Sequence, residues 1–254
     1  MDDFCAVVIV PIYRHGSAFS RMLPKLQQFG LPIIIIDDGS DSETCELLQK
    51  LAAEHENLYL QGHQVNQGKG AAVATGLKKA QAMGFSHALQ IDGDDQHDTA
   101  DISVFLAAAR DNPSALILGV PEFDASVPAL RRIGRYLTHF WIWIETLSLD
   151  ISDSMCGFRI YPISAVAPLL ELRWLGKRMD FDPEILVRLY WRDTPLVQIP
   201  TRVIYPESGR SNFKMFADNL LITLMHVRLV TGMLLRLPLL IFHRLVNVQH
   251  GSSN

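Results

Sequence analysis

The chain has 254 residues, of which 48% are hydrophobic and 20% are charged, and its formal net charge is −4. This length suits one large α/β domain with an appendage. Because the chain carries no overall positive charge, we expect no nucleic-acid partner. The mean hydropathy is slightly positive, which is typical of a soluble domain that also presents some surface to a membrane.

The cysteines and the first residues bear on the cellular compartment. Cys5, Cys45 and Cys156 are far apart and match neither a zinc-binding nor a Cys-x-x-Cys spacing. A small, odd number of cysteines is typical of a reducing compartment. The chain starts with Met1-Asp2-Asp3, which is acidic where the basic start of a signal peptide would be expected. We therefore expect a cytoplasmic protein.

Short apolar segments alternate with helical ones in the first hundred residues, which predicts a doubly wound, mainly parallel sheet. Because parallel strands end at one edge of such a sheet, where α/β proteins bind ligands, we expect the polar residues after them to share a site. The predicted strands are 6–10, 33–36, 58–61, 88–91, 116–119 and 196–205, and the predicted helices are 17–29, 42–55, 71–83, 101–110 and 185–191.

The segment after the fourth strand holds three carboxylates, Asp92, Asp94 and Asp95, within four residues. Carboxylates crowded at a strand end repel one another and lose solvation when they are buried. A divalent cation with oxygen ligands, Mg²⁺ or Mn²⁺, offsets this and keeps positions open for substrate phosphates. The Asp-x-Asp spacing therefore predicts a metal–diphosphate site. A plain acidic loop is the alternative, because so short a motif also occurs without function.

Two further loops are expected at the same edge. Asp37 and Asp38 can accept hydrogen bonds from a base or a ribose, or can cap the following helix. Residues 66–70, Asn-Gln-Gly-Lys-Gly, open another helix, where glycines permit close approach of a ligand and Lys69 adds a positive charge. The spacing is neither that of a Walker A loop nor Gly-x-Gly-x-x-Gly, so an ordinary glycine-containing helix start is the alternative.

The order of these motifs resembles that of the family 2 glycosyltransferases, in particular the branch of dolichyl- and polyprenyl-phosphate mannose synthases. The resemblance covers roughly residues 5 to 212, and a later Asp-x-x-x-Gly-Phe-Arg segment at 153–159 supports it. The motifs that carry it are Pro11-x-Tyr13, Asp37-Asp38-Gly39-Ser40, Asn66-x-Gly68-Lys69-Gly70 and Asp92-x-Asp94-x-Gln96-His97. The chain departs from the family at Arg14-His15, where Asn-Glu is more usual.

The resemblance implies a GT-A fold and an inverting, metal-dependent transfer from a nucleoside diphosphate sugar to a lipid-linked acceptor, either a polyprenyl phosphate or a glycolipid. It also implies roles for single residues. Pro11 and Tyr13 would line the nucleotide pocket, with Asp37 facing the base, Asp38 nearby and Lys69 beside the nucleotide. Asp92 would lie near the ribose or the metal, Asp94 would be the direct metal ligand, and Gln96 would lie near the diphosphate or the sugar.

The second half of the chain offers candidates for catalysis. Arg159 is predicted to bind a phosphate of donor or acceptor, or to be a structural ion-pair partner. Asp182 and Glu184 are candidate general bases, which a hydroxyl acceptor requires and an ionised phosphate acceptor does not. Asp182 also fits an N-cap ahead of Pro183, and Asp153 is a weaker candidate base. Residues 206–212 resemble the family's lid, in which Arg210 would donate to the diphosphate.

Two segments suggest contact with a membrane. Arg131, Arg132 and Arg135 precede a cluster of large aromatic residues at 136–143, which suits the headgroup level of a bilayer or an ordinary core helix. The tail is apolar but carries an arginine every eight residues from Arg228, and its uncharged run 229–235 is too short to span a bilayer. We predict one amphipathic helix to Pro238 and a short second one, both on the membrane surface with arginines toward the headgroups. The alternative is a helix packed on the catalytic domain or on a partner chain.

These observations predict a catalytic domain at 1–213, a helical membrane-surface appendage at 214–246 and a disordered end at 247–254. The protein would be a hexosyltransferase, peripheral at the inner face of the cell membrane. One alternative is a nucleotidyltransferase that uses the same sheet edge, although its glycine-rich activation loop is missing. Another is a non-catalytic, membrane-associated binding module.

Overall fold

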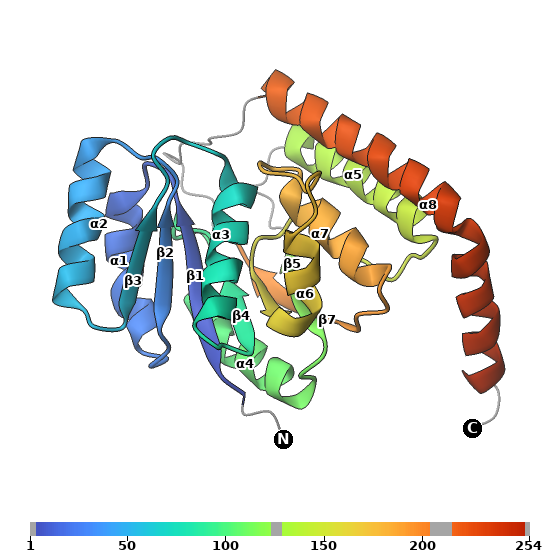
Figure 1. Cartoon of the computed structure of the whole chain (residues 1–254), viewed down its shortest axis with the longest axis horizontal. Coiled ribbons are helices and arrows are strands. Elements are labelled where there is room, and N and C mark those ends of the chain that lie inside the picture. The colour runs from blue at the N-terminus through green and yellow to red at the C-terminus, as the bar shows by residue number, and fades with distance from the viewer. Residues whose placement is uncertain (1–3, 123–128, 204–214, 252–254) are drawn as a thin grey trace.

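The structure is a computed structural model that describes residues 4–122, 129–203 and 215–251 (Figure 1). It contains a seven-stranded sheet in the order β3-β2-β1-β4-β6-β5-β7. The strands are β1 (Ala6–Ile12), β2 (Ile33–Asp37), β3 (Leu58–Gly62), β4 (His87–Gln90), β5 (Leu116–Glu122), β6 (Arg159–Pro162) and β7 (Leu196–Arg202). The helices are α1 (Gly16–Gln27), α2 (Ser42–Glu54), α3 (Lys69–Ala82), η1 (Thr99–Asp101), α4 (Ile102–Asp111), α5 (Ala129–Thr146), α6 (Ile163–Leu170), α7 (Phe181–Tyr190) and α8 (Met215–Gly251).

The predicted doubly wound, mainly parallel sheet is confirmed. β1 pairs in parallel with β2 and β4, β2 with β3, and β5 with β7, whereas β6 is antiparallel to both of its neighbours. Helices cover both faces, so the central strands are continuous apolar runs. In β1, Val8 and Val10 pack in a core with α1, α2 and α4, while Val7 and Ile9 pack in a second core with α3, α6 and α7.

Sequence analysis missed β6 and α6. β6 has the sequence Arg-Ile-Tyr-Pro, and neither its charged first residue nor its proline suggests a buried strand. All four of its residues are nevertheless buried, because the strand lies between β4 and β5 in the sheet.

The start of α7 also differs from the prediction. The N-cap is Asp180 rather than Asp182, and Pro183 is the third residue of the helix. Proline is tolerated there because the first four N–H groups of a helix have no partner within the helix.

Helix α8 is a single helix that continues through Pro238 and ends at Gly251, whereas the sequence suggested two shorter helices. Figure 1 shows it alongside α5, with its last part turned away from the line of the first. Such a change of direction is typical of a proline inside a helix. By length and composition alone, the stretch Phe216–Pro238 could cross a membrane when its charged residues are counted in, although the uncharged run 229–235 is shorter. Buried helices of soluble proteins pass the same test.

Two arginines of α8 contact the protein. Arg228 lies 3.0 Å from Glu184, and the guanidinium of the exposed Arg236 lies 5.0 Å from the centre of the Trp191 ring. The prediction that the arginines point outward is therefore wrong for Arg228, and the side chain of Arg244 lies outside the described residues. The physical reason is that Glu184 is fully buried, and a buried carboxylate requires a partner.

The outward side of α8 is mainly apolar, although Asn219, Thr223 and Thr231 are also exposed there. Its largest exposed fractions are those of Phe216 (93%) and Leu235 (80%). The neighbouring helix α5 also exposes apolar side chains, although its Thr138, His139 and Glu145 are buried. We refer to the exposed apolar residues of these two helices as the α5–α8 face, which comprises Tyr136, Leu137, Phe140, Trp141, Phe216, Leu220, Leu224, Val227, Leu234 and Leu235.

Candidate active site

The ends of β1, β2 and β4 meet at one edge of the sheet, as the strand pattern predicts. In the register of β1 and β2, Pro11 lies opposite Ile36 and Ile12 opposite Asp37, so Tyr13 and Asp37 project from neighbouring strand ends. Asp37 is buried and accepts a hydrogen bond from the Ser40 amide at 3.0 Å. The structure thus brings Pro11, Tyr13 and Asp37 together, at the edge where the nucleotide is expected.

Asp38 has a different surrounding from the predicted one. Its carboxylate is 2% exposed and accepts hydrogen bonds from the amides of Gln67 and Gly68 at 2.9 and 2.8 Å. The side chains of Asn66 and His63 complete its surroundings at 2.9 and 2.7 Å. Four partners from a single segment make Asp38 the residue that shapes the loop before α3, rather than a contact for the nucleotide.

The glycines of this loop do not form a phosphate cradle. A Cβ atom on Gly68 would lie 2.4 Å from the carbonyl oxygen of Lys177, and one on Gly70 would lie 2.3 Å from Cβ of Phe181. The Lys177 carbonyl also accepts the Ala71 amide at the start of α3, at 2.9 Å. The glycines are therefore needed because residues 177–181 pack against them, and the N-terminus of α3 is covered by protein.

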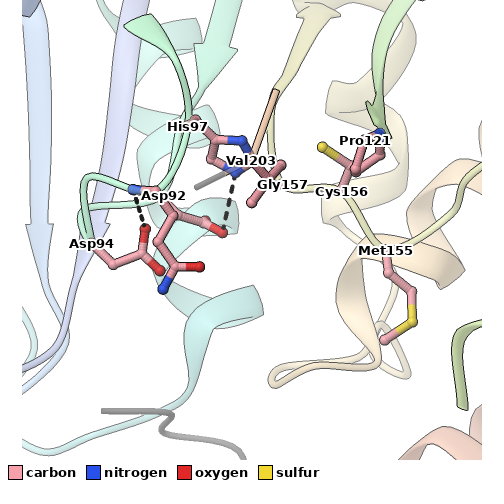
Figure 2. A pocket seen from close by; sticks show the side chains of 9 residues that line it. Asp92, Asp94, His97, Pro121, Met155, Cys156, Gly157 and Val203 are labelled. Atoms are coloured by element: carbon pink, nitrogen blue, oxygen red, sulfur yellow. Dashed lines mark hydrogen bonds and ion pairs between the residues drawn. The ribbon is translucent and has the colours of Figure 1, made fainter. Parts of the chain in front are cut away.

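The acidic segment after β4 lines a pocket, together with residues from β5, β7 and the loop before β6 (Figure 2). Asp92, Asp94 and Gln96 line it as the sequence predicted, and His97 joins them with its Nε2 4.0 Å from Asp92. Burial, and next to it the charge of Asp92, raises the pKa of Asp94 to about 6. The remaining lining residues are Pro121, Met155, Cys156, Gly157 and Val203.

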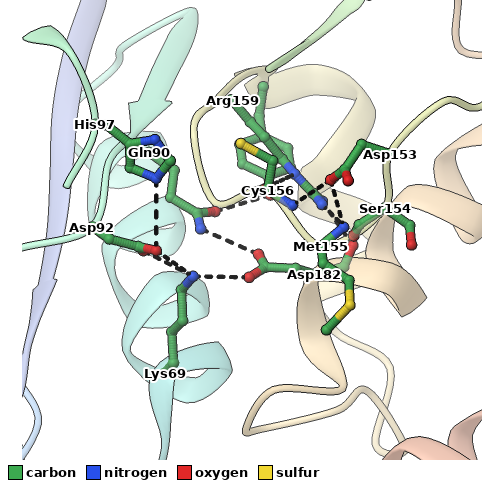
Figure 3. A network of polar contacts seen from close by, with 11 residues as sticks. Lys69, Gln90, Asp92, His97, Asp153, Ser154, Met155, Cys156, Arg159 and Asp182 are labelled. Atoms are coloured by element: carbon green, nitrogen blue, oxygen red, sulfur yellow. Dashed lines mark hydrogen bonds and ion pairs between the residues drawn. The ribbon is translucent and has the colours of Figure 1, made fainter. Parts of the chain in front are cut away.

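Lys69 is the only cation that links the two sides of this site in the described part of the chain (Figure 3). Its ammonium lies 2.8 Å from the carboxylate of Asp92 and 3.0 Å from that of Asp182. Burial alone would lower the pKa of Lys69, but Asp182 and Asp92 raise it well above its ordinary value. Despite burial, Lys69 in turn lowers the pKa of Asp92. Lys69 and Asp92 are thus both charged at neutral pH.

Arg159 cannot bind a phosphate in this arrangement, which corrects the prediction. Its side chain is fully buried, and three of its nitrogens donate to the backbone carbonyls of Cys156, Ser154 and Asp182, each at 2.7 Å. It ties the loop before β6 to the first turn of α7. Sequence analysis could not distinguish this structural function, because an arginine next to a glycine suggests either possibility.

The other candidate bases lie apart from the pocket. Glu184 is fully buried, and its hydrogen-bond partners are the Gly176 amide and the guanidinium groups of Arg188 and Arg228. This corrects the prediction, since a fully buried carboxylate with three partners is not offered to a substrate. Asp153 is 2% exposed and accepts the amides of two following residues. Arg210 and the predicted lid lie outside the described residues.

Asp182 is the candidate base that does reach Lys69 and, through it, Asp92. Besides Lys69, it accepts a hydrogen bond from the amide of Gln90 at 3.1 Å, and Tyr161 donates to the same Gln90 at 3.0 Å. Gln90 and Tyr161 were missed by sequence analysis, because they occupy strand positions that read only as core.

The residues at the end of β4 fit a divalent cation. Asp92 and Asp94 are like charges close enough to perturb each other, and Mg²⁺ or Mn²⁺ commonly binds through two carboxylates plus substrate oxygens and water. The described residues contain no cluster of three or more acidic, histidine or cysteine ligands that could hold an ion alone. The arrangement therefore suits a metal that arrives with a diphosphate, and not a permanent structural ion.

Solved structures share this architecture and identify it as the GT-A fold of glycosyltransferases. A glucosyl-3-phosphoglycerate synthase from Mycobacterium tuberculosis, in complex with Mn²⁺ and UDP-glucose, has a TM-score of 0.61 at 15% identity, covering 92% of this chain and 79% of that one. A mannosyltransferase from Pyrobaculum calidifontis, in complex with GDP-Man and Mn²⁺, has a TM-score of 0.55 at 14% identity. The match covers 80% of this chain and 58% of the mannosyltransferase.

The family model described as Glycosyl transferase family 2 matches residues 7–164, and the chain belongs to this family. A UDP-N-acetylglucosamine–dolichyl-phosphate N-acetylglucosaminyltransferase from Methanococcus voltae is 25% identical over 224 residues, 82% of this chain and 88% of the relative. A dolichyl-phosphate β-glucosyltransferase from Dictyostelium discoideum is 26% identical over 223 residues, 78% of this chain and 66% of the relative. The alternatives of a nucleotidyltransferase and a non-catalytic module are thereby set aside.

Gly157 gives a first test of the site. A Cβ atom there would lie 2.6 Å from the Lys69 ammonium and 2.8 Å from the Asp92 carboxylate, so Gly157→Ala must push this ion pair aside. We expect kcat to fall about 100-fold, as for an ångström-scale misplacement of a catalytic group. Gly62→Ala is the matched control, because its nearest neighbour would be at 4.0 Å. Equal activity of the two variants would contradict this account of the site.

Asp94 gives a second test, through folding stability. Its pKa rises from 3.8 to about 6 in the folded protein, so its contribution to stability is complete below pH ~4 and is lost as the pH rises through about 6. Asp94→Asn removes the cost of ionising this partly buried carboxyl group. In EDTA at pH 8, we expect urea unfolding to give the variant a free energy of unfolding about 1 to 2 kcal/mol above that of the wild type. The difference should shrink toward pH 4, and a less stable variant at pH 8 would refute the assignment.

Proposed function

We propose that this glycosyltransferase moves a sugar from a nucleoside diphosphate sugar to a polyprenyl phosphate at a membrane surface, with a divalent metal ion and with inversion. The choice of acceptor rests on one observation, the contacts that the Asp182 side chain makes. Its carboxylate is held by the Lys69 ammonium at 3.0 Å and by Gln90 at 3.1 Å.

A hydroxyl acceptor requires a base that removes its proton during attack. Both oxygens of the Asp182 carboxylate are already engaged, one by the Lys69 ammonium and the other by the side-chain amide of Gln90, so the carboxylate is not presented to an acceptor hydroxyl. A phosphate acceptor is already ionised and requires no such group. The ion pair of Asp182 therefore favours the phosphate, in agreement with the dolichyl-phosphate acceptors in the names of the Methanococcus voltae and Dictyostelium discoideum relatives.

On the donor side, Asp92 and Asp94 would hold the metal ion, with Pro11, Tyr13 and Asp37 around the nucleotide and Gln96 near the diphosphate or sugar. Bound there, the metal would neutralise charge on the leaving diphosphate. Lys69 would add a fixed positive charge next to Asp92, which stabilises negative charge that develops in a water-poor site. A phosphate oxygen of the acceptor that attacks the anomeric carbon opposite the diphosphate inverts its configuration in one step.

The α5–α8 face would contact the membrane that holds the acceptor. Helix α5 lies alongside α8 (Figure 1) and has four exposed apolar residues, two of which are Tyr136 and Trp141. Aromatic rings with one polar edge are enriched at the interface of bilayers. Residues 1–213 would then form the catalytic unit and residues 214–246 the membrane appendage, with residues 247–254 as the C-terminal tail. The protein would act at the inner face of the cell membrane.

Titration calorimetry tests the reaction class. We expect UDP- or GDP-sugars to bind with Mn²⁺ and not with EDTA, and Asp94→Ala to remove the binding. Purified protein should then glycosylate a short polyprenyl phosphate and leave the corresponding polyprenol unchanged. Failure of the folded wild type to bind any nucleotide sugar would overturn the proposal, and equal transfer to the polyprenol would overturn the choice of acceptor.

Cosedimentation with anionic vesicles tests the membrane face. Leu220→Glu and Leu224→Glu place charges where burial of each leucine would contribute about 1.5 to 3 kcal/mol, so each should weaken vesicle binding at least about tenfold. Val104→Glu is the control, because Val104 is 52% exposed on α4 behind the other face of the sheet. Unchanged vesicle binding, or a shift from dimer to monomer in the leucine variants, would argue that another copy of the chain covers this face.

A further inference from the structure

Residues 176–184, here called the bridging segment, lie between the loop before α3 and helix α8. On the loop side, the carbonyl of Lys177 accepts the Ala71 amide at 2.9 Å. The side-chain stem of Arg178 passes so close to Gly68 that a Cβ there would be 2.7 Å from it. The start of α3, which carries Lys69, is therefore seated directly on the bridging segment.

The opposite side of the bridging segment is bound to α8 through Arg178 and Arg228, and Arg228 also lies 4.0 Å from the Asp180 carboxylate. Nε of Arg178 donates to Asp218 at 3.1 Å, and Arg228 donates to Glu184 at 3.0 Å. Both acceptors are buried, with Asp218 1% and Glu184 0% exposed. Charge-assisted contacts to buried carboxylates are weakly screened by salt and hold their geometry well.

Arg178 contacts both sides at once. Besides Asp218, its guanidinium lies 3.5 Å from the Asn66 side-chain oxygen, and Asn66 donates to Asp38 at 2.9 Å. Asp38 accepts the amides that shape the loop, including that of Gly68 at 2.8 Å. A continuous polar chain therefore runs from the first turn of α8 to the loop that positions Lys69.

The contact between Arg228 and Glu184 reaches Lys69 through α7. Glu184 and Asp182 both lie in the first turn of α7, so a displacement of Glu184 moves Asp182 with it. Asp182 in turn holds the Lys69 ammonium at 3.0 Å.

We propose that α8 supports the donor site, with Arg178 as the positioning residue that joins them. The helix that would seat the enzyme on the membrane would then also fix the loop before α3 and the Lys69–Asp182 pair. The donor site and the membrane part of this inference rest on the proposed function, whereas the contacts join α8 to the loop before α3 whatever that loop binds.

Hydrogen exchange of the full chain tests the inference without any ligand. Asp218→Asn removes the negative charge that faces Arg178, and Arg228→Gln removes the positive charge that faces Glu184 and Asp180. Glu184 keeps Arg188 as a partner at 2.6 Å in the second variant. We expect the amides of Gly68 and Ala71 to exchange about threefold to tenfold faster in both. Amides of β1 and β2 should be unchanged, which separates positioning from general destabilisation.

Thr231→Val is the matched control on α8, because its hydroxyl bonds only to the carbonyl of Val227 in the same helix among the contacts described. Wild-type exchange at Gly68 and Ala71 in both test variants would overturn the inference. So would faster exchange across the whole sheet, since that indicates a merely structural contribution.

Titration of UDP and GDP with Mn²⁺ supplies the functional readout. In the two α8 variants we expect about threefold to tenfold weaker binding of the nucleotide that the wild type prefers, with vesicle binding retained. Arg178→Lys keeps a cation and should fall between the wild type and Asp218→Asn. Unchanged affinity would overturn the inference. Binding of neither nucleotide by the wild type would instead overturn the proposed function, while the exchange experiment still decides this one.

Discussion

The Lys69 ammonium, between the part-buried Asp92 and the buried Asp182, is the interaction on which the rest of this site depends. It contacts both carboxylates, the charge of Arg159 also acts on them, and Asp94 adds a further acidic group close to Asp92. Removing one partner of a buried ion pair leaves an uncompensated charge that costs several kcal/mol. Three carboxylates lie beside two cations here, an excess of negative charge that suits the proposed metal ion.

Much of the surrounding structure serves to place this ammonium. Lys69 is the first residue of α3, so its position depends on the loop before that helix. Asp38 shapes the loop from within, and residues 177–181 press on its glycines from outside. Arg159 joins the loop before β6 to α7 and so holds both Gly157 and Asp182 next to the ammonium. Asp38 and Arg159, which resemble ligand contacts in the sequence, thus act by holding the backbone.

The sequence revealed the fold and the residues at the strand ends, because both follow from local patterns. A β-branched run such as that of β1 and the carboxylates after β4 need no knowledge of distant segments. Glu184 was misassigned because its partner Arg228 is 44 residues away, and the contact of Lys69 with Asp182 was missed because it joins segments far apart in the sequence. The direction of Arg228 was mispredicted for the same reason. The arginines of α8 fit anionic lipids equally well until the buried carboxylate of α7 is known.

The antiparallel direction of β6 has a topological consequence. A chain that leaves a parallel strand must return to the opposite edge of the sheet before the next parallel strand can begin. β5 and β6 are antiparallel, so the chain leaves β5 and enters β6 at the same edge, the one that holds the site. Everything between Glu122 and Arg159, including α5, is therefore an excursion that starts and finishes beside the reacting groups. Such an excursion can lengthen, shorten or change its sequence without altering the order of the strands, which makes it the natural place for evolution to vary acceptor selectivity on a constant donor site.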